Sequence, residues 1–151
     1  MDDFSEKMQS LLADFGKGRK MVLSTSAEGL VSSRMMSVVQ LDGIFYFQTD
    51  MTMKKYRQIA QNHHVALCID NFQIEGICKE KGHPLDNAAF CKLFRECYKG
   101  SFDAYTSLKN ERLFSVKPLH IERWVYQGGV PYLELFDVNN RKYRIDQYAG
   151  V

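Results

Sequence analysis

The chain has 151 residues, of which 45% are hydrophobic and 25% are charged. These values are ordinary for one globular domain, so they exclude a disordered chain, a collagen and a coiled coil. The 20 Lys and Arg residues almost balance the 18 Asp and Glu residues, whereas proteins that bind nucleic acid through its phosphates usually carry a strong basic excess. No apolar run approaches the roughly 18 residues of a membrane-spanning helix, and the acidic start does not resemble a secretory signal. We therefore expect one domain over residues 1–151, in the cytoplasm, without a nucleic-acid or membrane partner.

The first 50 residues predict one helix followed by three antiparallel strands. Apolar residues recur at helical spacing over about residues 2–15, and glycines follow. Two extended stretches come next, at 21–25 and 30–41. Asp42-Gly43 is a strong two-residue hairpin signal, and the aromatic run Ile44–Phe47 returns as the third strand.

The rest of the chain predicts two inserted helices and further strands. A short helix is expected at about 52–62, with Tyr56, Ile59 and Ala60 on its apolar face, and a second helix at about 85–98. Strands are expected at 65–69, 72–78, 113–116 and 119–126, the last two separated by Lys117-Pro118, and a β extension at about 130–146. Strands and helices do not alternate, which favours a small antiparallel barrel over a parallel sheet.

The cysteines and histidines lack the spacing of a metal or redox site. No Cys-x-x-Cys pair occurs among Cys68, Cys78, Cys91 and Cys97, and such pairs are typical of zinc sites and thiol oxidoreductases. We expect reduced thiols that are buried or half-buried. The histidines are interpreted as structural or surface residues, and no metal site is predicted: His63, His64, His83 and His120.

Arg34 lies within an otherwise apolar strand and is the first candidate for chemistry. A period of two places Arg34, Met36 and Val38 on one face, and Met35, Ser37 and Val39 on the other. Arg34 could hold a ligand, or its long side chain could simply reach solvent from the strand entry.

The segment from Gln48 to Lys55 leads directly into the helix expected at about 52–62. A helix N-terminus presents unpaired N–H groups and the positive end of the helix dipole, so it can bind an anion. Lys54 and Lys55 oppose that dipole unless an anion is present. In the alternative interpretation, Thr52 caps the helix and the lysines are solvated.

Trp124 is the single tryptophan of the chain. A tryptophan in such a strand is more often a core or interface residue than a ligand contact.

Several motifs occur in a characteristic order. They are Arg34-Met35-Met36, Tyr46-Phe47-Gln48-Thr49, Lys55 at the next helix, Asn62–Leu67, and the stretch from Phe114 to Trp124. In order and spacing they resemble the FMN-binding split-barrel family, which includes pyridoxamine 5′-phosphate oxidase and the general-stress-protein-like flavoproteins. The resemblance covers most of residues 3–126.

The resemblance implies a mainly β fold, a six-stranded antiparallel split β-barrel of Greek-key type with flanking and inserted helices. It also implies a homodimer with FMN at the subunit interface. Side chains and backbone groups would hold the FMN phosphate: Arg34, Lys55, Thr49 and the backbone of Thr52, Met53 and Lys54. Further contacts with the cofactor would come from the backbone of Met35, Met36 and Ser37 along the isoalloxazine edge, from Gln48, and from Trp124 of the partner subunit.

Two positions depart from the family pattern. Met53 stands where a serine is common, so one hydroxyl that could bind the phosphate is missing. Val39 stands where the oxidase has a lysine that grips its substrate phosphate, and the oxidase's C-terminal substrate motif has no match. Oxidation of pyridoxamine phosphate is therefore not expected.

Three hypotheses follow for function. The first is an FMN-dependent oxidoreductase that exchanges hydride with a nicotinamide or another small molecule, the flavin supplying the redox chemistry; no catalytic residue is predicted. The second is a non-catalytic flavin- or haem-binding module. The third is a partner-binding β-barrel without a cofactor, since 13% of the residues are aromatic and could line an interface.

Overall fold

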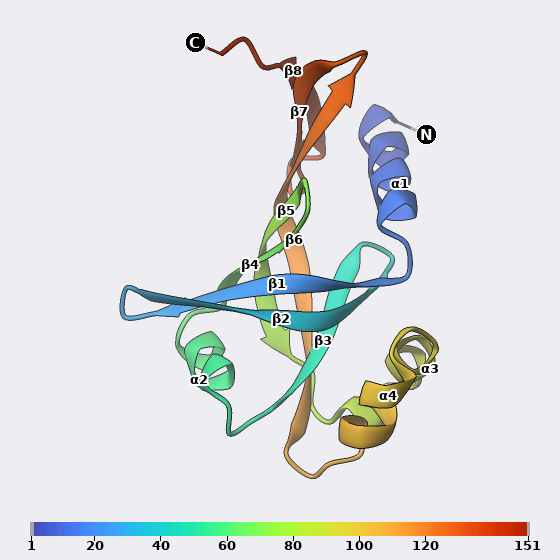
Figure 1. Cartoon of the computed structure of the whole chain (residues 1–151). Helices are drawn as coiled ribbons and strands as arrows, with labels where there is room; N and C mark the ends of the chain where they lie inside the picture. Colours follow the sequence, from blue (N-terminus) through green and yellow to red (C-terminus); the bar gives the residue numbers. More distant parts are fainter. Residues whose placement is uncertain (1, 151) are drawn as a thin grey trace.

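The computed structural model describes residues 2–150 and is built mainly from β-strands (Figure 1). Within that range the strands are β1 Gly18–Ala27, β2 Leu30–Leu41, β3 Ile44–Asp50, β4 His64–Ile69, β5 Phe72–Glu80, β6 Glu111–Gln127, β7 Val130–Asp137 and β8 Lys142–Gln147. The helical segments are α1 Asp3–Phe15, α2 Lys54–Gln61, the 3₁₀ turn η1 Pro84–Asp86, α3 Ala88–Cys97, α4 Lys99–Ser101 and the π-helical turn η2 Phe102–Thr106. None of these helices has the length and apolar character needed to cross a membrane.

Six strands close into an antiparallel barrel in the order β3-β2-β1-β4-β5-β6, because β3 also pairs with β6. The first three strands form a meander, and β4 returns to lie beside β1, which is the Greek-key arrangement. Asp42 and Gly43 link β2 to β3 in the predicted two-residue hairpin, and their φ angles of 52° and 84° are those that a type I′ turn requires. The six-stranded barrel is thus confirmed.

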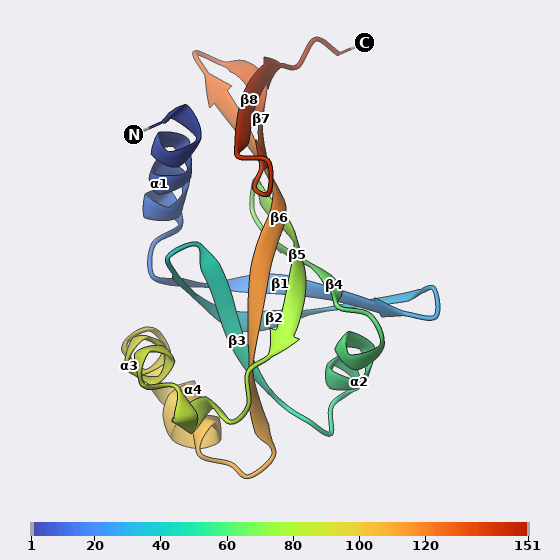
Figure 2. The same ribbon diagram turned by 180° about the vertical axis from the view of Figure 1, so that it is seen from behind.

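β7 and β8 extend the sheet from β6 beyond the barrel (Figures 1 and 2). α1 packs against one face of this projection. The Phe4 ring lies 6.3 Å from that of Phe136, which in turn lies 4.9 Å from the Tyr143 ring. The β extension expected at about 130–146 corresponds to these two strands, and the helix expected at about 2–15 corresponds to α1.

β6 runs without interruption from Glu111 to Gln127, so the expected break at Lys117-Pro118 is wrong. The register between β5 and β6 shifts between Glu75 and Gly76, beside Pro118. A β-bulge tolerates proline because the ladder is locally disrupted there. Gly76 also permits a close approach of the strands, since a Cβ at that position would lie 2.7 Å from the carbonyl oxygen of Lys117. One strand therefore connects the barrel to the projection.

Two hydrophobic clusters hold the molecule together. The first fills the barrel and continues to α1, and it includes the stacked rings of Phe47 and Phe114, 5.3 Å apart. The second lies outside the barrel wall, between β2, β3, β6 and α3, and includes Val39, Phe90 and Phe94. The helical insert thus covers one side of the barrel, and α2 lies on the other side in both views (Figures 1 and 2).

The insert differs from the single helix expected at about 85–98. Asn87 Oδ1 accepts a hydrogen bond from the Phe90 N–H at 2.9 Å and so caps a new helix that begins at Ala88. Helical structure then continues through α4 and η2 to Thr106. The sequence pattern missed this continuation, because Gly100 and Ser101 are typical of a loop.

Candidate functional site

The barrel is open between β2 and β3. These strands pair only where residues 39–41 face residues 44–46. Along Leu30–Val38, β2 pairs with β1 on one edge and has no backbone partner among residues 2–150 on the other. Successive residues of a strand direct their N–H and C=O groups to alternate edges, so about half of these groups face the opening. Met35, Met36 and Ser37, which we expect along the flavin, all belong to this stretch.

Arg34 is held against the protein at the end of the barrel. Its Nη1 donates to the Leu23 carbonyl oxygen at 3.2 Å and to Thr25 Oγ1 at 2.7 Å, and its Nη2 donates to Gln58 Oε1 at 3.3 Å. Thr25 Oγ1 also donates to Gln58 Oε1, at 2.6 Å. A guanidinium has five N–H donors, so Nε and one donor on Nη2 remain for a ligand. These bonds do not fit the alternative in which Arg34 only reaches solvent.

α2 turns a polar face toward this network. Its buried residues are Lys55, Gln58 and Ile59. Ala60, which we expected on the buried face, is exposed. Lys55 and Gln58 are three positions apart and are therefore neighbours on the helix surface. The contact of Arg34 with Gln58 thus places two cations on the same side of α2.

The pKa values of both cations are lowered. Burial lowers the pKa of both Lys55 and Arg34, and the charge of Arg34 lowers the pKa of Lys55 further. The carboxylates of Glu111 and Asp50 act in the opposite direction on the Lys55 pKa, yet neither cation forms an ion pair within residues 2–150. Two partly desolvated cations side by side are unfavourable without an anion. The arrangement therefore suits a dianionic group such as a phosphate ester.

The start of α2 has no side-chain cap. Met53 is the N-cap residue and forms no cap bond, so the interpretation of Thr52 as the cap is wrong. Thr52 instead donates from its N–H and its Oγ1 to Asp50 Oδ1, at 2.7 and 2.6 Å. The Met53 N–H donates to the Asp50 carbonyl oxygen at 3.1 Å. Two of the three expected backbone donors are thus already bonded. The N–H groups at the helix start that have no acceptor among residues 2–150 are those of Lys54 and Lys55.

Gln48 and Thr49 lie on opposite faces of β3 because side chains alternate along a strand. Gln48 Oε1 accepts a hydrogen bond from Thr106 Oγ1 of the helical insert at 3.0 Å. Thr49 shares its face with Phe47, which belongs to the core inside the barrel. Both side chains are buried. Of the two, Thr49 faces the side on which Arg34 lies, and the Gln48 side chain is engaged elsewhere.

Three residues of the site carry no motif in the sequence. Thr25 and Gln58 orient Arg34, and Glu111 is a buried acid whose pKa is raised by burial and by Asp50. The helical spacing between Lys55 and Gln58 is the signal in the sequence that could identify Gln58 as a site residue. Glu111 precedes the apolar run of β6 and offers no such signal.

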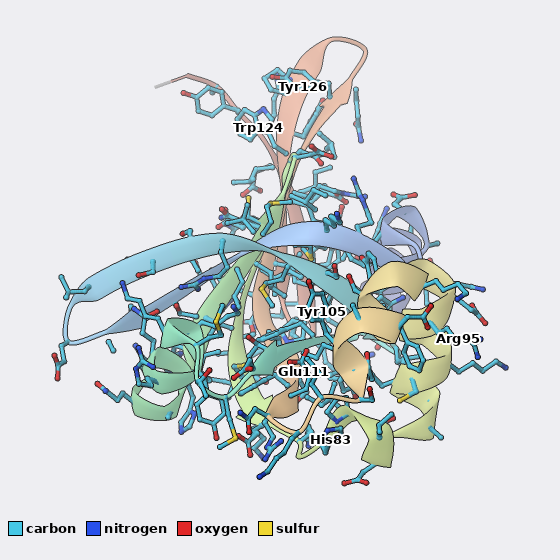
Figure 3. The ribbon with its side chains drawn as sticks, turned by 60° about the horizontal axis from the view of Figure 1, so that its bottom comes forward. His83, Arg95, Tyr105, Glu111, Trp124 and Tyr126 are labelled. Atoms are coloured by element: carbon cyan, nitrogen blue, oxygen red, sulfur yellow. The ribbon has the colours of Figure 1, made fainter. Side chains whose placement is uncertain are left out.

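Trp124 is far from the two cations within one chain. It lies near the end of β6, while Glu111, which affects the pKa of Lys55, begins the strand (Figure 3). Thirteen residues of strand span roughly 40 Å. A contact of Trp124 with a ligand at Arg34 and Lys55 would therefore require a second subunit.

The two departures from the family pattern lie in different environments. Val39 is fully buried in the cluster under α3, with Phe90 and Phe94. A side chain at that position cannot contact a ligand in the opening between the strands. Met53 is 48% exposed at the start of α2.

The cysteines are free thiols, and no group of three or more His, Cys, Asp or Glu side chains in residues 2–150 could hold a metal ion. Burial raises the pKa of the Cys78 thiol to about 12. Cys68 is exposed, which corrects the expectation that all four thiols are at least half-buried.

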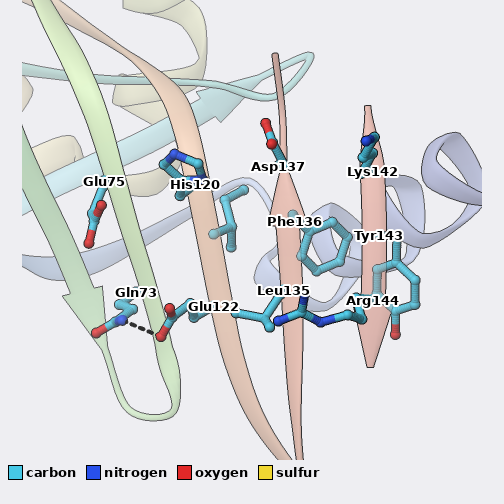
Figure 4. A pocket seen from close by; sticks show the side chains of 11 residues that line it. Gln73, Glu75, His120, Glu122, Leu135, Phe136, Asp137, Lys142, Tyr143 and Arg144 are labelled. Atoms are coloured by element: carbon cyan, nitrogen blue, oxygen red, sulfur yellow. Dashed lines mark hydrogen bonds between the residues drawn. The ribbon is translucent and has the colours of Figure 1, made fainter. Parts of the chain in front are cut away.

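A hollow of about 270 Å³ lies on the outer face of the sheet formed by β5 to β8 (Figure 4). Its lining includes a cross-strand row of ionisable residues in register: Glu75, His120, Asp137 and Lys142. None of the expected cofactor residues lines it.

No family model matches the chain, and no curated protein sequence does. Solved structures do match. General Stress Protein 26 from Bacillus anthracis is 21% identical, with a TM-score of 0.59 over 80% of this chain and 92% of that one. A pyridoxamine 5′-phosphate oxidase-related, FMN binding protein from Nostoc punctiforme is 14% identical, with a TM-score of 0.60 over 96% and 93%.

A heme binding protein from Mycobacterium smegmatis is 12% identical, with a TM-score of 0.64 over 98% of this chain and 58% of that one. The resemblance seen in the motifs thus extends to the whole architecture. By its fold, the chain is a split barrel of the pyridoxamine 5′-phosphate oxidase-like type.

Proposed function

We propose that the chain binds FMN in the opening between β2 and β3. The observation that carries this proposal is the pair of partly buried cations, Arg34 and Lys55, beside the uncapped start of α2. Arg34 has two free N–H donors, and Lys55 presents an ammonium group; together they match the charge of a phosphate monoester. Thr49 and the free backbone N–H groups at the helix start would complete the phosphate site.

The open edge of β2 suits the flavin ring. Unpaired N–H and C=O groups along Met35, Met36 and Ser37 offer the alternating donors and acceptors that the polar edge of an isoalloxazine needs. The Nostoc punctiforme structure with this fold is described as FMN binding. In our proposal Trp124 of a second copy covers the ring, which makes a homodimer the functional unit.

We further propose that the protein is an oxidoreductase. Bound FMN supplies hydride-transfer chemistry, and this chain binds and orients it and controls access to it. A nicotinamide or another small molecule would be the reaction partner. Pyridoxamine phosphate is not proposed as the substrate, because Val39 occupies the position of the phosphate-gripping lysine and is buried away from the opening.

A non-catalytic flavin- or haem-binding role is the alternative, since the Mycobacterium smegmatis structure with the same fold is described as heme binding. Haem would also be an anion in this opening, through its propionates. The two cations at a helix start match a compact phosphate more closely than two separate carboxylates. The identity of the bound cofactor therefore distinguishes the two proposals.

The test is an absorption spectrum of the purified protein before and after incubation with FMN and desalting. Retention of the two visible bands of an oxidised flavin, in about one equivalent per chain, supports the proposal. A single intense Soret band favours haem. Retained flavin that NADH or NADPH bleaches, with turnover on an acceptor, supports the enzyme. A flat spectrum after incubation with FMN overturns the FMN proposal. The same result after incubation with haemin overturns the haem alternative and leaves the partner-binding barrel.

A further inference from the structure

Trp124 is partly exposed, yet hydrogen bonds and an aromatic contact hold both its backbone and its indole ring. Asn71, in the turn between β4 and β5, bonds both backbone groups of Trp124. The Trp124 N–H donates to the Asn71 carbonyl oxygen at 3.0 Å, and Asn71 Nδ2 donates to the Trp124 carbonyl oxygen at 2.6 Å. The indole Nε1 donates to the Tyr126 hydroxyl at 3.1 Å, and the Tyr148 ring lies 5.2 Å away at 61°. The indole is therefore preorganised, and Tyr126 lies near it on the projection (Figure 3).

A groove of about 460 Å³ lies beside this indole, on the sheet face that α1 does not cover. That volume is within the range of small-molecule sites. The side chains of Trp124 and Leu133, which are cross-strand partners, give the groove apolar walls. It adjoins the hollow of Figure 4, because Gln73 and Glu122 line both.

The charge of the groove has one sign. Its lining includes the carboxylates of Asp70 and Glu122 and no Lys or Arg. Asp70 Oδ2 pairs with Arg19 at 2.9 Å. Within residues 2–150, Glu122 Oε2 accepts only from the neutral amide of Gln73, at 2.7 Å. Glu122 therefore contributes a net negative charge next to an aromatic face, and that combination attracts organic cations.

The geometry points to a binding site beside Trp124 for a planar cationic heterocycle, such as an N-alkylated pyridinium ring. The ring would stack on the indole, and Glu122 would balance its charge. Anionic rings of the same shape would be rejected, because no cation lines the groove. The site itself needs no flavin. Its role as a substrate site rests on the proposed function, in which Trp124 lies against the flavin of the second subunit.

The chain provides its own probe, because Trp124 is its single tryptophan. We would titrate the protein, without added FMN, with 1-methylnicotinamide, nicotinamide and nicotinic acid. These three rings have nearly the same shape and are cationic, neutral and anionic at pH 7. Quenching of the Trp124 fluorescence, checked by calorimetry, gives each Kd. For fragments of this size we expect binding of about millimolar affinity, with the cation at least about fivefold tighter than the anion.

Two variants and one control complete the test. Glu122→Gln should bring the cation to within about twofold of neutral nicotinamide, and Trp124→Leu should abolish calorimetric binding while circular dichroism shows a folded chain. Glu75→Gln is the control: it removes one carboxylate from the same sheet face but outside this groove, and it should leave the Kd unchanged.

Equal affinity for the three rings, no binding of the cation, or the same loss in Glu75→Gln would overturn the inference. An FMN titration of the same samples separates the two proposals. Cation binding without FMN binding leaves the groove standing and removes the proposed function. FMN binding without cation binding supports the proposed function and overturns the cation site.

Discussion

Removing the two cations at the start of α2 should weaken the binding of FMN but not that of riboflavin, which has the same ring and no phosphate. Arg34 and Lys55 are partly buried, and neither has an ion-pair partner in the described chain. A hydrogen bond to a charged group contributes about 1.5–3 kcal/mol. Each single alanine variant should therefore raise the Kd of FMN by roughly 10- to 150-fold.

The double variant Arg34→Ala/Lys55→Ala should lose less than the product of the two single effects. The side chains are close enough for Arg34 to lower the Lys55 pKa, and residues in one network are not additive. A bound phosphate also relieves the repulsion between the two cations, and each single substitution already removes that contribution, so the double variant does not lose it twice. We expect a total loss of about 10²- to 10³-fold for FMN.

The assay is flavin fluorescence during titration of apoprotein, with both flavins in parallel. Lys54→Ala is the matched control, because Lys54 is the adjacent lysine and its side chain is exposed. In our proposal only the backbone N–H of Lys54 binds the phosphate, and the substitution keeps it. It should change the Kd of FMN by less than about threefold. Wild-type affinity for FMN in the double variant would refute the assignment of the phosphate site. An equal loss for riboflavin would mean that the substitutions damage the fold or the ring site.

Three further predictions follow. FMN affinity should fall at alkaline pH, above the lowered pKa of Lys55, because the ammonium loses its proton. It should also fall below about pH 6, because the phosphate gains a proton. Calorimetry from about pH 5 to pH 10 should show both losses of affinity, and Lys55→Gln should remove only the alkaline one. Gly76→Ala should cost about 1–3 kcal/mol in urea unfolding because its Cβ would lie 2.7 Å from a β6 carbonyl oxygen, whereas Gly100→Ala, with nothing within 4 Å, should change stability by less than about 1 kcal/mol. Cys78, buried and with a pKa of about 12, should react with Ellman's reagent only after unfolding, while exposed Cys68 reacts in the native state.

Much of the local structure follows from short-range patterns in the sequence. The helical spacing before Gly16, the Asp42-Gly43 turn and the alternation around Arg34 each depend on neighbouring residues alone, and each corresponds to an observed element or face. The motif order was sufficient to place the chain in the split-barrel fold. Arg34 and Lys55 could be selected because a cation in an apolar strand and a lysine at a helix start are locally unusual.

Contacts between distant segments were decided by the tertiary structure. No local pattern predicts that Thr25 and Gln58 hold the Arg34 guanidinium, because they come from a strand and a helix 33 residues apart. The uninterrupted course of β6 through Pro118 depends on a register shift in another strand.

Thr52 looks like a helix cap in sequence, and it donates to Asp50 instead because the preceding strand ends there. The same holds for the groove beside Trp124. The backbone of Trp124 is held by Asn71, which is 53 residues away in sequence and adjacent only in the folded sheet. Sequence periodicity reports the environment of a segment, whereas a site is assembled from side chains that folding brings together.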